Sequence, residues 1–255
     1  MTTQNELKSL SKRRQSPIDV RDDEAHPIEM VPLTIVGHWL NDGEAIMSNN
    51  GEYAILNLKG DRVPSLLRGG PLSGEYEFLN AHFHWGVDDS CGSEHLLNGA
   101  PFSMEAHIVH WNRKYHSFQE CLKQEDGICV LAFFFLAQDD DDCSKCAMLD
   151  KITEHLKDVV EYKSETIIPA NSLCWIREAT RSDYYYFYQG SLTAGGLEEC
   201  VTWIIFPVVL PITHAQIAEF RHLKSEKGRE VMENRRNVQR IYDRKIYKAL
   251  IQQLT

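Results

Sequence analysis

The stretch that decides the fold is Tyr76-Glu77-Phe78-Leu79-Asn80-Ala81-His82-Phe83-His84-Trp85, an aromatic-rich run that predicts one long β-strand. Side chains alternate between the two faces of a strand, so His82 and His84 point the same way and lie close enough to share one ion. By itself, such a pair on an apolar strand is more often two core or surface histidines than a metal site. Its sequence context therefore decides between the two interpretations.

A second predicted strand, Ser103 to Asn112, repeats the spacing with Glu105 and His107. A third histidine completes a trigonal set, and three histidines with an open fourth position are typical of catalytic zinc, whereas structural zinc is closed by four protein ligands. Neutral imidazoles leave the metal its full charge, so that bound water loses a proton at about pH 7. We therefore expect Zn²⁺ at His82, His84 and His107.

Each metal-bound imidazole needs a partner that orients its other ring nitrogen. Glu105, two positions before His107, suits this role better than that of a ligand, and Asn80 stands in the same relation to His82. We expect both side chains to support the metal ligands.

The remaining pattern predicts a mixed but predominantly β protein. Short extended or apolar segments recur between turn signals, at Glu52 to Leu58, Tyr76 to Trp85, Ser103 to Asn112, Ile128 to Ala137, Tyr184 to Tyr188 and Val201 to Val208. Helical periodicity is confined to Ala147 to Val160 and to Thr213 to Ser225, where Thr213 is a suitable N-cap. We expect a 12-residue tail (1–12) followed by one domain (13–255), without an internal repeat.

Composition excludes two classes of protein. A net charge of −10 argues against a nucleic-acid partner, because phosphate binding relies on clustered Lys and Arg. The longest apolar runs, Ile128 to Ala137 and the Pro-interrupted Val201 to Ile212, are too short to span a bilayer. We therefore expect neither nucleic-acid binding nor a membrane span.

The N-terminus and the cysteines bear on location. The polar opening is not a secretory signal, and Glu6 argues against a mitochondrial transit peptide. Seven cysteines in a chain long enough to build a core favour a reducing compartment, so we expect a cytoplasmic protein. Cys143 and Cys146 form one CxxC next to four aspartates, for which an ordinary acidic loop is a simpler interpretation than a metal or redox site.

Several linked motifs resemble the α-class carbonic anhydrases in order and spacing. They are Arg14-Gln15-Ser16-Pro17-Ile18-Asp19, His82 to Gly86, Gly92-Ser93-Glu94-His95, Glu105 to Asn112, Tyr188 to Thr193 and Asn234-Arg235-Arg236. The resemblance implies a single domain built on a large twisted, mostly antiparallel central β-sheet with peripheral helices. It also implies reversible hydration of CO₂ to bicarbonate and a proton by zinc-bound hydroxide, and inhibition by sulfonamides.

Residue by residue, the resemblance matches His82, His84 and His107 to the zinc ligands and Glu105 to the acid that fixes the third ligand. It matches Thr193 and Glu94 to the hydroxyl and carboxylate that control the nucleophile. An ionised Glu94 can only accept a hydrogen bond, so Thr193 must donate to it. The family's apolar substrate wall corresponds here to Val109, Val130, Leu192, Val201 and Trp203, with Ala194 beside the product anion.

The chain departs from its family at the proton shuttle. Where fast members carry a histidine, it has Glu52 followed by Tyr53. An exposed glutamate has a pKa of about 4.3 and zinc-bound water about 7, so proton transfer to Glu52 is uphill by roughly 3.7 kcal/mol. We expect slow proton release, with Glu52 a weak relay; His26 and His38 are alternatives, although each is more simply an exposed, solvated histidine.

Further departures affect the rim of the site. Asn80 stands where many members have Gln, and Ala194-Gly195-Gly196 replaces the usual Thr-Pro-Pro, so this loop should be more mobile. Leu197 occupies a position where secreted members often place a cysteine, which leaves Cys200 as an expected buried free thiol. The family's aromatic N-terminal segment is not matched. A catalytically weak or inactive relative that acts as a binding module is the alternative function, but the three histidines argue for activity.

Overall fold

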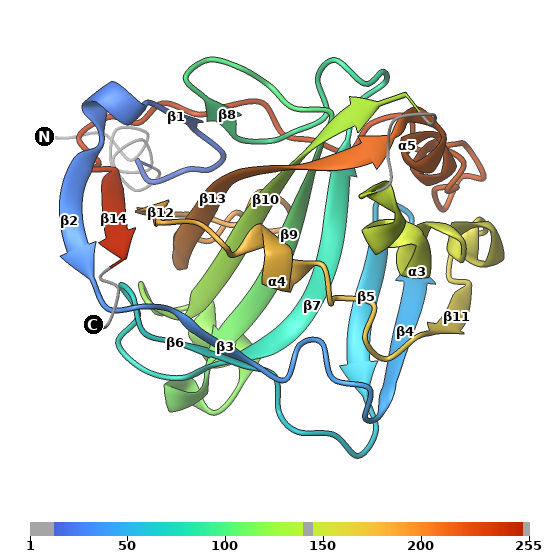
Figure 1. The fold of residues 1–255 in the computed structure, drawn as a ribbon, viewed down its shortest axis with the longest axis horizontal. Helices are drawn as coiled ribbons and strands as arrows, with labels where there is room; N and C mark the ends of the chain where they lie inside the picture. Colours follow the sequence, from blue (N-terminus) through green and yellow to red (C-terminus); the bar gives the residue numbers. More distant parts are fainter. Residues whose placement is uncertain (1–12, 140–144, 252–255) are drawn as a thin grey trace, which may run out of the picture.

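The computed structural model describes residues 13–139 and 145–251, so the expected tail 1–12 and Cys143 lie outside the described residues. The fold is built on one 12-stranded sheet, whose main path is β11-β4-β5-β7-β9-β10-β13-β12-β14-β2 (Figure 1). Its strands are β2 (His26–Met30), β3 (Thr34–Val36), β4 (Glu44–Asn49), β5 (Ala54–Lys59), β6 (Leu66–Arg68), β7 (Tyr76–Trp85), β9 (Met104–Asn112), β10 (Ile128–Gln138), β11 (Glu165–Ile168), β12 (Tyr184–Gly190), β13 (Val201–Thr213) and β14 (Tyr247–Ile251).

Most neighbouring strands in this sheet are antiparallel, and the exceptions are β10 with β13 and β14 with β2. The short strands β1 (Asp19–Val20) and β8 (Leu96–Leu97) form a separate parallel pair. The prediction of a predominantly β fold with a large, mostly antiparallel sheet is therefore confirmed.

Short helices surround the sheet, and α4 lies in front of its middle strands in the view of Figure 1. They are η1 (Asp22–Glu24), η2 (Arg113–Tyr115), α2 (Phe118–Cys121), η4 (Cys146–Leu149), α3 (Asp150–Thr153), η5 (Leu156–Val159), α4 (Ile176–Ala179) and α5 (His214–Arg221). Thr213 is the N-cap of α5 and forms a complete capping box with Gln216, as its sequence predicts. The helix ends at Arg221, four residues before the predicted end.

The single helix predicted over Ala147 to Val160 is wrong, because η4, α3 and η5 divide this segment into three short pieces. The predicted apolar face is nevertheless buried, since Leu149, Ile152, Leu156 and Val159 are at most 1% exposed. The Thr153 hydroxyl donates to the carbonyl of Leu149, and such local bonds compete with regular helical hydrogen bonding. Periodicity therefore predicted the burial of this apolar face correctly, but it did not predict where the helix is interrupted.

The sheet separates two buried clusters. On one face the aromatic residues Phe133, Phe206 and Trp175 belong to the larger cluster. On the other face Val109, Val130 and Trp203 belong to the smaller one. Alternation along β9 and β10 assigns consecutive residues to opposite faces, so that each strand contributes to both clusters.

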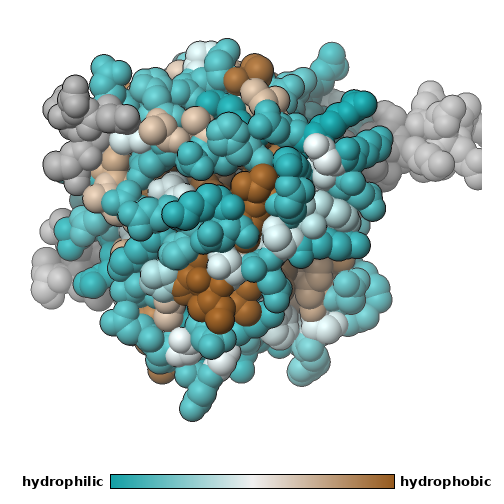
Figure 2. Space-filling model, turned by 90° about the vertical axis from the view of Figure 1, so that its right-hand side faces the viewer, coloured by the Kyte–Doolittle hydropathy of each residue, from teal (hydrophilic) through white to brown (hydrophobic). Residues whose placement is uncertain are grey.

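The outer surface is mainly hydrophilic on the side where edge strand β11 lies, with a compact hydrophobic patch (Figure 2). Ile167 of the edge strand β11 is 63% exposed. No helix among the described residues is both long and apolar enough to cross a membrane.

Candidate metal centre

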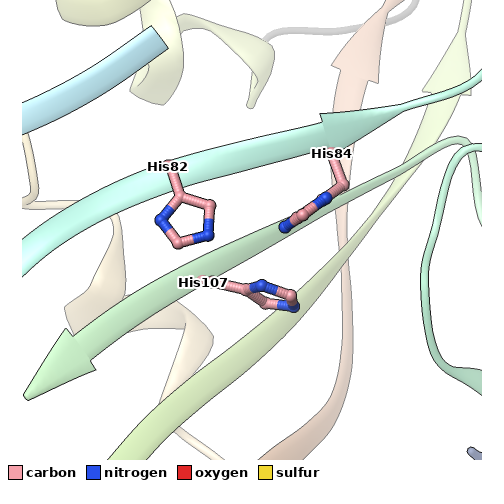
Figure 3. Close-up of side chains that lie close together, drawn as sticks. All are labelled: His82, His84 and His107. Carbon is pink, nitrogen blue, oxygen red and sulfur yellow. The ribbon is translucent and has the colours of Figure 1, made fainter. Parts of the chain in front are cut away.

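Three histidine rings converge from two neighbouring antiparallel strands (Figure 3). In the register of β7 and β9, His82 lies opposite His107 and His84 lies opposite Glu105. The ring centroids are 5.2 Å apart for His82 and His84, 5.4 Å for His82 and His107, and 4.4 Å for His84 and His107. Strand alternation and register together therefore gather the three imidazoles on one face of the sheet.

One nitrogen of each ring lies within 4.8 Å of the corresponding nitrogens of the other two. Nitrogens bonded to one Zn²⁺ at about 2.0–2.1 Å are at most about 4.2 Å apart, so a small closure of the rings is enough for a shared ion. His82, His84 and His107 form a group of three possible ligands among the described residues. Three protein ligands are typical of an open catalytic site.

The other nitrogen of each ring is already used. Asn80 Oδ1 lies 2.9 Å from His82 Nδ1, and the Asn234 carbonyl oxygen lies 3.0 Å from His84 Nδ1. Glu105 Oε1 lies 2.7 Å from His107 Nε2. Because each partner accepts, these nitrogens carry the proton, and the lone pairs of His82 Nε2, His84 Nε2 and His107 Nδ1 point to the common centre.

The residues present fit a metal ion. His84 Nε2 is buried and has no hydrogen-bond partner among the described residues, which is costly unless a ligand occupies the centre. Burial, together with the neighbouring histidines, holds the pKa of His82 and of His84 well below the usual value. Both rings are therefore neutral near pH 7, the form in which imidazole binds zinc.

Glu105 is the most heavily hydrogen-bonded group at the centre. Besides His107, its carboxylate accepts from the backbone N–H groups of Glu94 and His95 at 2.9 and 2.8 Å and from the His95 ring at 2.7 Å. Burial opposes ionisation of Glu105, but His95 and His107 outweigh it and hold its pKa well below the usual range. Glu105 is therefore a fixed anion behind His107.

His95 extends this network away from the centre. The Tyr188 hydroxyl lies 2.7 Å from His95 Nε2 and 2.8 Å from Ser16 Oγ. All three side chains are buried. The sequence places His95 in a motif but does not reveal its role, because the fold is needed to bring it to its partner Glu105.

Glu94 lies beside the centre without joining the three histidines. Its Oε2 is 3.6 Å from His84 Nε2 and 3.9 Å from His107 Nδ1, while its Oε1 accepts from the backbone N–H of Arg236 at 2.7 Å. Burial raises its pKa, and the nearby Thr193 hydroxyl opposes that rise. Glu94 Oε2 has no hydrogen bond of normal length from the described residues, so the expected Thr193 to Glu94 bond stays a prediction.

An apolar cavity of about 200 Å³ opens onto the centre. Of the predicted wall, Val109, Val130, Leu192, Ala194 and Trp203 line it, together with Thr193, His82 and His107. Val201 is not in this lining; it is fully buried in the adjacent core cluster. The structure thus brings together all of the predicted wall except Val201.

Five further residues line the cavity that were not predicted from the sequence: Asn50, Tyr53, Ile55, Leu79 and Phe118. Leu79 lines the cavity where the register of β7 against β9 shifts between Phe78 and Asn80, an irregularity that strict alternation does not predict. Tyr53 was named only as the residue that follows Glu52. No sequence pattern distinguishes these side chains from ordinary core residues.

The proposed proton relays are not at the cavity. Glu52 is exposed and is not among the lining residues, and His26 is exposed on β2. The expectation of an exposed His38 is wrong, because this side chain is fully buried and its Nε2 lies 2.8 Å from His110 Nε2. His110 is three residues after His107, so strand alternation directs it to the opposite face of the sheet.

Comparisons with known proteins agree with this geometry. A family model described as eukaryotic-type carbonic anhydrase matches residues 3–250. Carbonic anhydrase 1 of Monodelphis domestica is 34% identical over 239 residues, which cover 91% of this chain and 87% of the relative. Carbonic anhydrase 3 of Homo sapiens is 32% identical over 221 residues, which cover 85% and 80% respectively. The chain therefore belongs to the eukaryotic-type carbonic anhydrase family.

Proposed function

We propose that this protein is a carbonate dehydratase that reversibly hydrates CO₂ to bicarbonate and a proton, with Zn²⁺ held by His82, His84 and His107. One observation carries the proposal: three ring nitrogens with free lone pairs face a common centre at the edge of an apolar cavity. When bound, the ion supplies a Lewis acid that ionises water near neutral pH. The protein supplies the geometry and the surroundings.

The groups behind the histidines prepare the centre. Asn80, Glu105 and the Asn234 carbonyl hold each ring in the tautomer and orientation that a ligand needs. The charge of Glu105 also increases the electron density of the His107 ring through their hydrogen bond. These contacts exist before any ion binds, so little reorganisation is required.

Thr193 and Glu94 are proposed to control the attacking water. An ionised Glu94 accepts a hydrogen bond from the Thr193 hydroxyl, so Thr193 Oγ1 can only accept a hydrogen bond from the nucleophile. The nucleophile then holds its O–H toward Thr193 and directs a lone pair at the carbon of CO₂. The Arg236 N–H bond to Glu94 Oε1 fixes the carboxylate for this role.

The apolar wall is suited to CO₂, which is uncharged and lacks hydrogen-bond donors. Val109, Val130, Leu192 and Trp203 lie at the cavity beside the centre. Binding at such a surface carries no desolvation penalty for a nonpolar substrate. The charged product would lose its hydration there without gaining hydrogen bonds in return. Bicarbonate is therefore released to water rather than retained.

Export of the proton is proposed to limit turnover. His82 and His107 are the histidines among the described lining residues, and both are assigned to the metal. Glu52, at the position of the family's shuttle, is exposed and is not among the residues that line the cavity, so we expect it to be a poor relay. We expect the rate to rise and then saturate as an imidazole-type buffer is added; a buffer-independent rate near 10⁶ per second would contradict this.

The decisive experiment is stopped-flow CO₂ hydration by protein whose zinc content has been measured, with and without a sulfonamide inhibitor. Activity proportional to zinc and lost on inhibitor binding supports the proposal. A zinc-loaded sample that neither hydrates CO₂ nor binds small anions would instead favour a binding module that has kept the fold.

A cytoplasmic location is also proposed, on the state of the cysteines. Cys91, Cys121, Cys129, Cys174 and Cys200 are free, with Cys200 buried as expected, whereas Cys146 is disulfide-bonded. Several free thiols in one domain are typical of a reducing compartment. Cell fractionation with an antibody to the protein tests this, and recovery in the secreted fraction would contradict it.

A further inference from the structure

Tyr53 stands directly against two of the three histidines. Its ring centroid is 5.0 Å from that of His82 and 5.2 Å from that of His84, with the ring planes inclined by 53° and 69°. The ring centroid of Trp203 lies 4.8 Å from that of His107. The histidine cluster therefore contacts two large aromatic side chains, both of which line the cavity.

The turn before β5 fixes the position of Tyr53. Asn50 Oδ1 accepts the backbone N–H groups of Glu52 and Tyr53 at 3.0 and 2.8 Å, and Asn49 Oδ1 accepts that of Gly51 at 2.7 Å. Gly51 has a φ of +93°, and a Cβ there would lie 3.1 Å from the Tyr162 ring. A turn with these restraints cannot easily swing Tyr53 away when a ligand enters.

The cavity that remains is small. Its volume of about 200 Å³ lies below the range of about 300–1,000 Å³ that is usual for pockets holding drug-sized ligands. Ile55, Leu79 and Phe118 narrow it further from other strands and from α2. A ligand that reaches the three nitrogens must therefore fit beside the Tyr53 ring.

We propose that Tyr53 is a specificity-determining residue, which limits the ligands of the metal centre to small molecules and weakens the binding of those with a bulky group next to the atom that binds the ion. This inference rests on the proposed function, because it requires the ion at the three histidines. It predicts that CO₂ and small anions enter freely, whereas aromatic sulfonamides and ester substrates are disfavoured.

The test compares two sulfonamides with the same zinc-binding group, the small trifluoromethanesulfonamide and a naphthalenesulfonamide, by calorimetry on zinc-loaded protein. The native protein and the variants Tyr53→Ala, Tyr53→Val and Tyr53→Phe are measured. The quantity of interest is the ratio of the two dissociation constants, because intrinsic differences between the compounds cancel when the ratio is compared between variants.

In Tyr53→Ala, we expect the dissociation constant of the naphthalenesulfonamide, divided by that of the small sulfonamide, to fall by about tenfold or more. A steric cost of about 1.4 kcal/mol corresponds to this factor. The ratio for Tyr53→Val should lie between those of the native protein and Tyr53→Ala. The ratio for Tyr53→Phe should match that of the native protein, because this variant keeps the ring. Thermal melting and zinc content verify that each variant is folded and loaded.

An unchanged ratio in folded, zinc-loaded Tyr53→Ala would overturn the inference while leaving the proposed function intact. A tenfold change in Tyr53→Phe would also overturn it, because the hydroxyl rather than the ring would then be responsible. If neither compound nor azide binds the zinc-loaded native protein, the proposed function itself fails, and the inference fails with it.

Discussion

The two faces of the central sheet each hold a histidine cluster, and the clusters differ in how their nitrogens are used. On one face, His82, His84 and His107 bond outward to fixed acceptors and leave three lone pairs facing one point. On the other face, His38 and His110 bond to each other, and His38 Nδ1 also bonds to the Val36 carbonyl at 2.9 Å. A metal centre thus requires convergent nitrogens that no protein group has already taken.

The surroundings reinforce this difference. The His38 and His110 rings lie against Phe78, at 5.6 and 6.1 Å between centroids, and both are fully buried. The first cluster instead opens onto a cavity. One set of imidazoles is therefore accessible to an ion and a substrate, and the other is part of the core.

The strongest test removes imidazoles from each cluster in turn. His84→Ala should reduce bound zinc to less than about a tenth per chain and CO₂ hydration to the uncatalysed rate, because two ligands do not retain a structural or catalytic zinc. The control is the double variant His38→Leu/His110→Leu, which loses two imidazoles and should keep its zinc. Equal zinc loss in both, measured by atomic absorption, would contradict the distinction between the clusters.

The second test uses pH. Burial lowers the pKa of His38 to about 4, and also lowers that of His110 well below the usual value. In the unfolded chain these histidines take up protons near pH 6.5, whereas in the folded protein they do not. Their contribution to the free energy of unfolding should therefore be constant above pH 6.5 and should fall between pH 6.5 and 4.

The loss from His38 should be on the order of 3 kcal/mol at the acid end of that range. Urea unfolding at pH 7, 6 and 5 measures it, with the double leucine variant as the control. The variant should show a shallower dependence on pH, because it lacks the buried His38 and His110 imidazoles that resist protonation in the folded state. Parallel pH profiles for the two proteins would contradict the prediction.

Glu105→Gln should weaken zinc binding by about 10- to 100-fold, the usual effect of losing a group that orients a ligand. The amide keeps the shape of the side chain but lacks the charge that polarises His107, and its N–H₂ cannot accept from the ring. Competition with a chromophoric chelator measures the affinity. Affinity within twofold of the native protein would show that the carboxylate does not support the ligand.

Asn80→Ala should have the smallest effect, a loss of zinc affinity of about tenfold, because a water molecule can replace the neutral amide at this partly exposed ring. The same chelator assay applies. A larger loss than in Glu105→Gln would reverse the proposed ranking of the charged and neutral supports.

Local pattern was sufficient for much of the fold and for placing the candidate metal ligands together. Strand β7 was predicted with its observed bounds, and two-residue alternation identified His82, His84, Glu105 and Asn80 as candidates on one face. Their contacts depend on neighbours two positions apart in a strand, which regular geometry determines without knowledge of distant segments.

Contacts made across the sequence were not accessible in the same way. The Asn234 carbonyl that orients His84 lies 150 residues away, and a backbone oxygen carries no signature in the sequence. The helix over Ala147 to Val160 was predicted as continuous because periodicity reports a buried face, not the local hydrogen bonds that break it. The roles of Thr193 and Glu94 remain predictions for the experiments above.

The sequence by itself determined which residues are able to bind a metal, since residue type and strand period settle which side chains share a face. Only the tertiary structure decided which histidines are free to bind it. In the fold, His38 is hydrogen-bonded to His110, and the Tyr53 ring lies against His82 and His84. The lone pairs of His82, His84 and His107 face one point. Hydrogen-bond partners and cavity walls come from segments far apart in the chain, and only packing of the whole sheet brings them together.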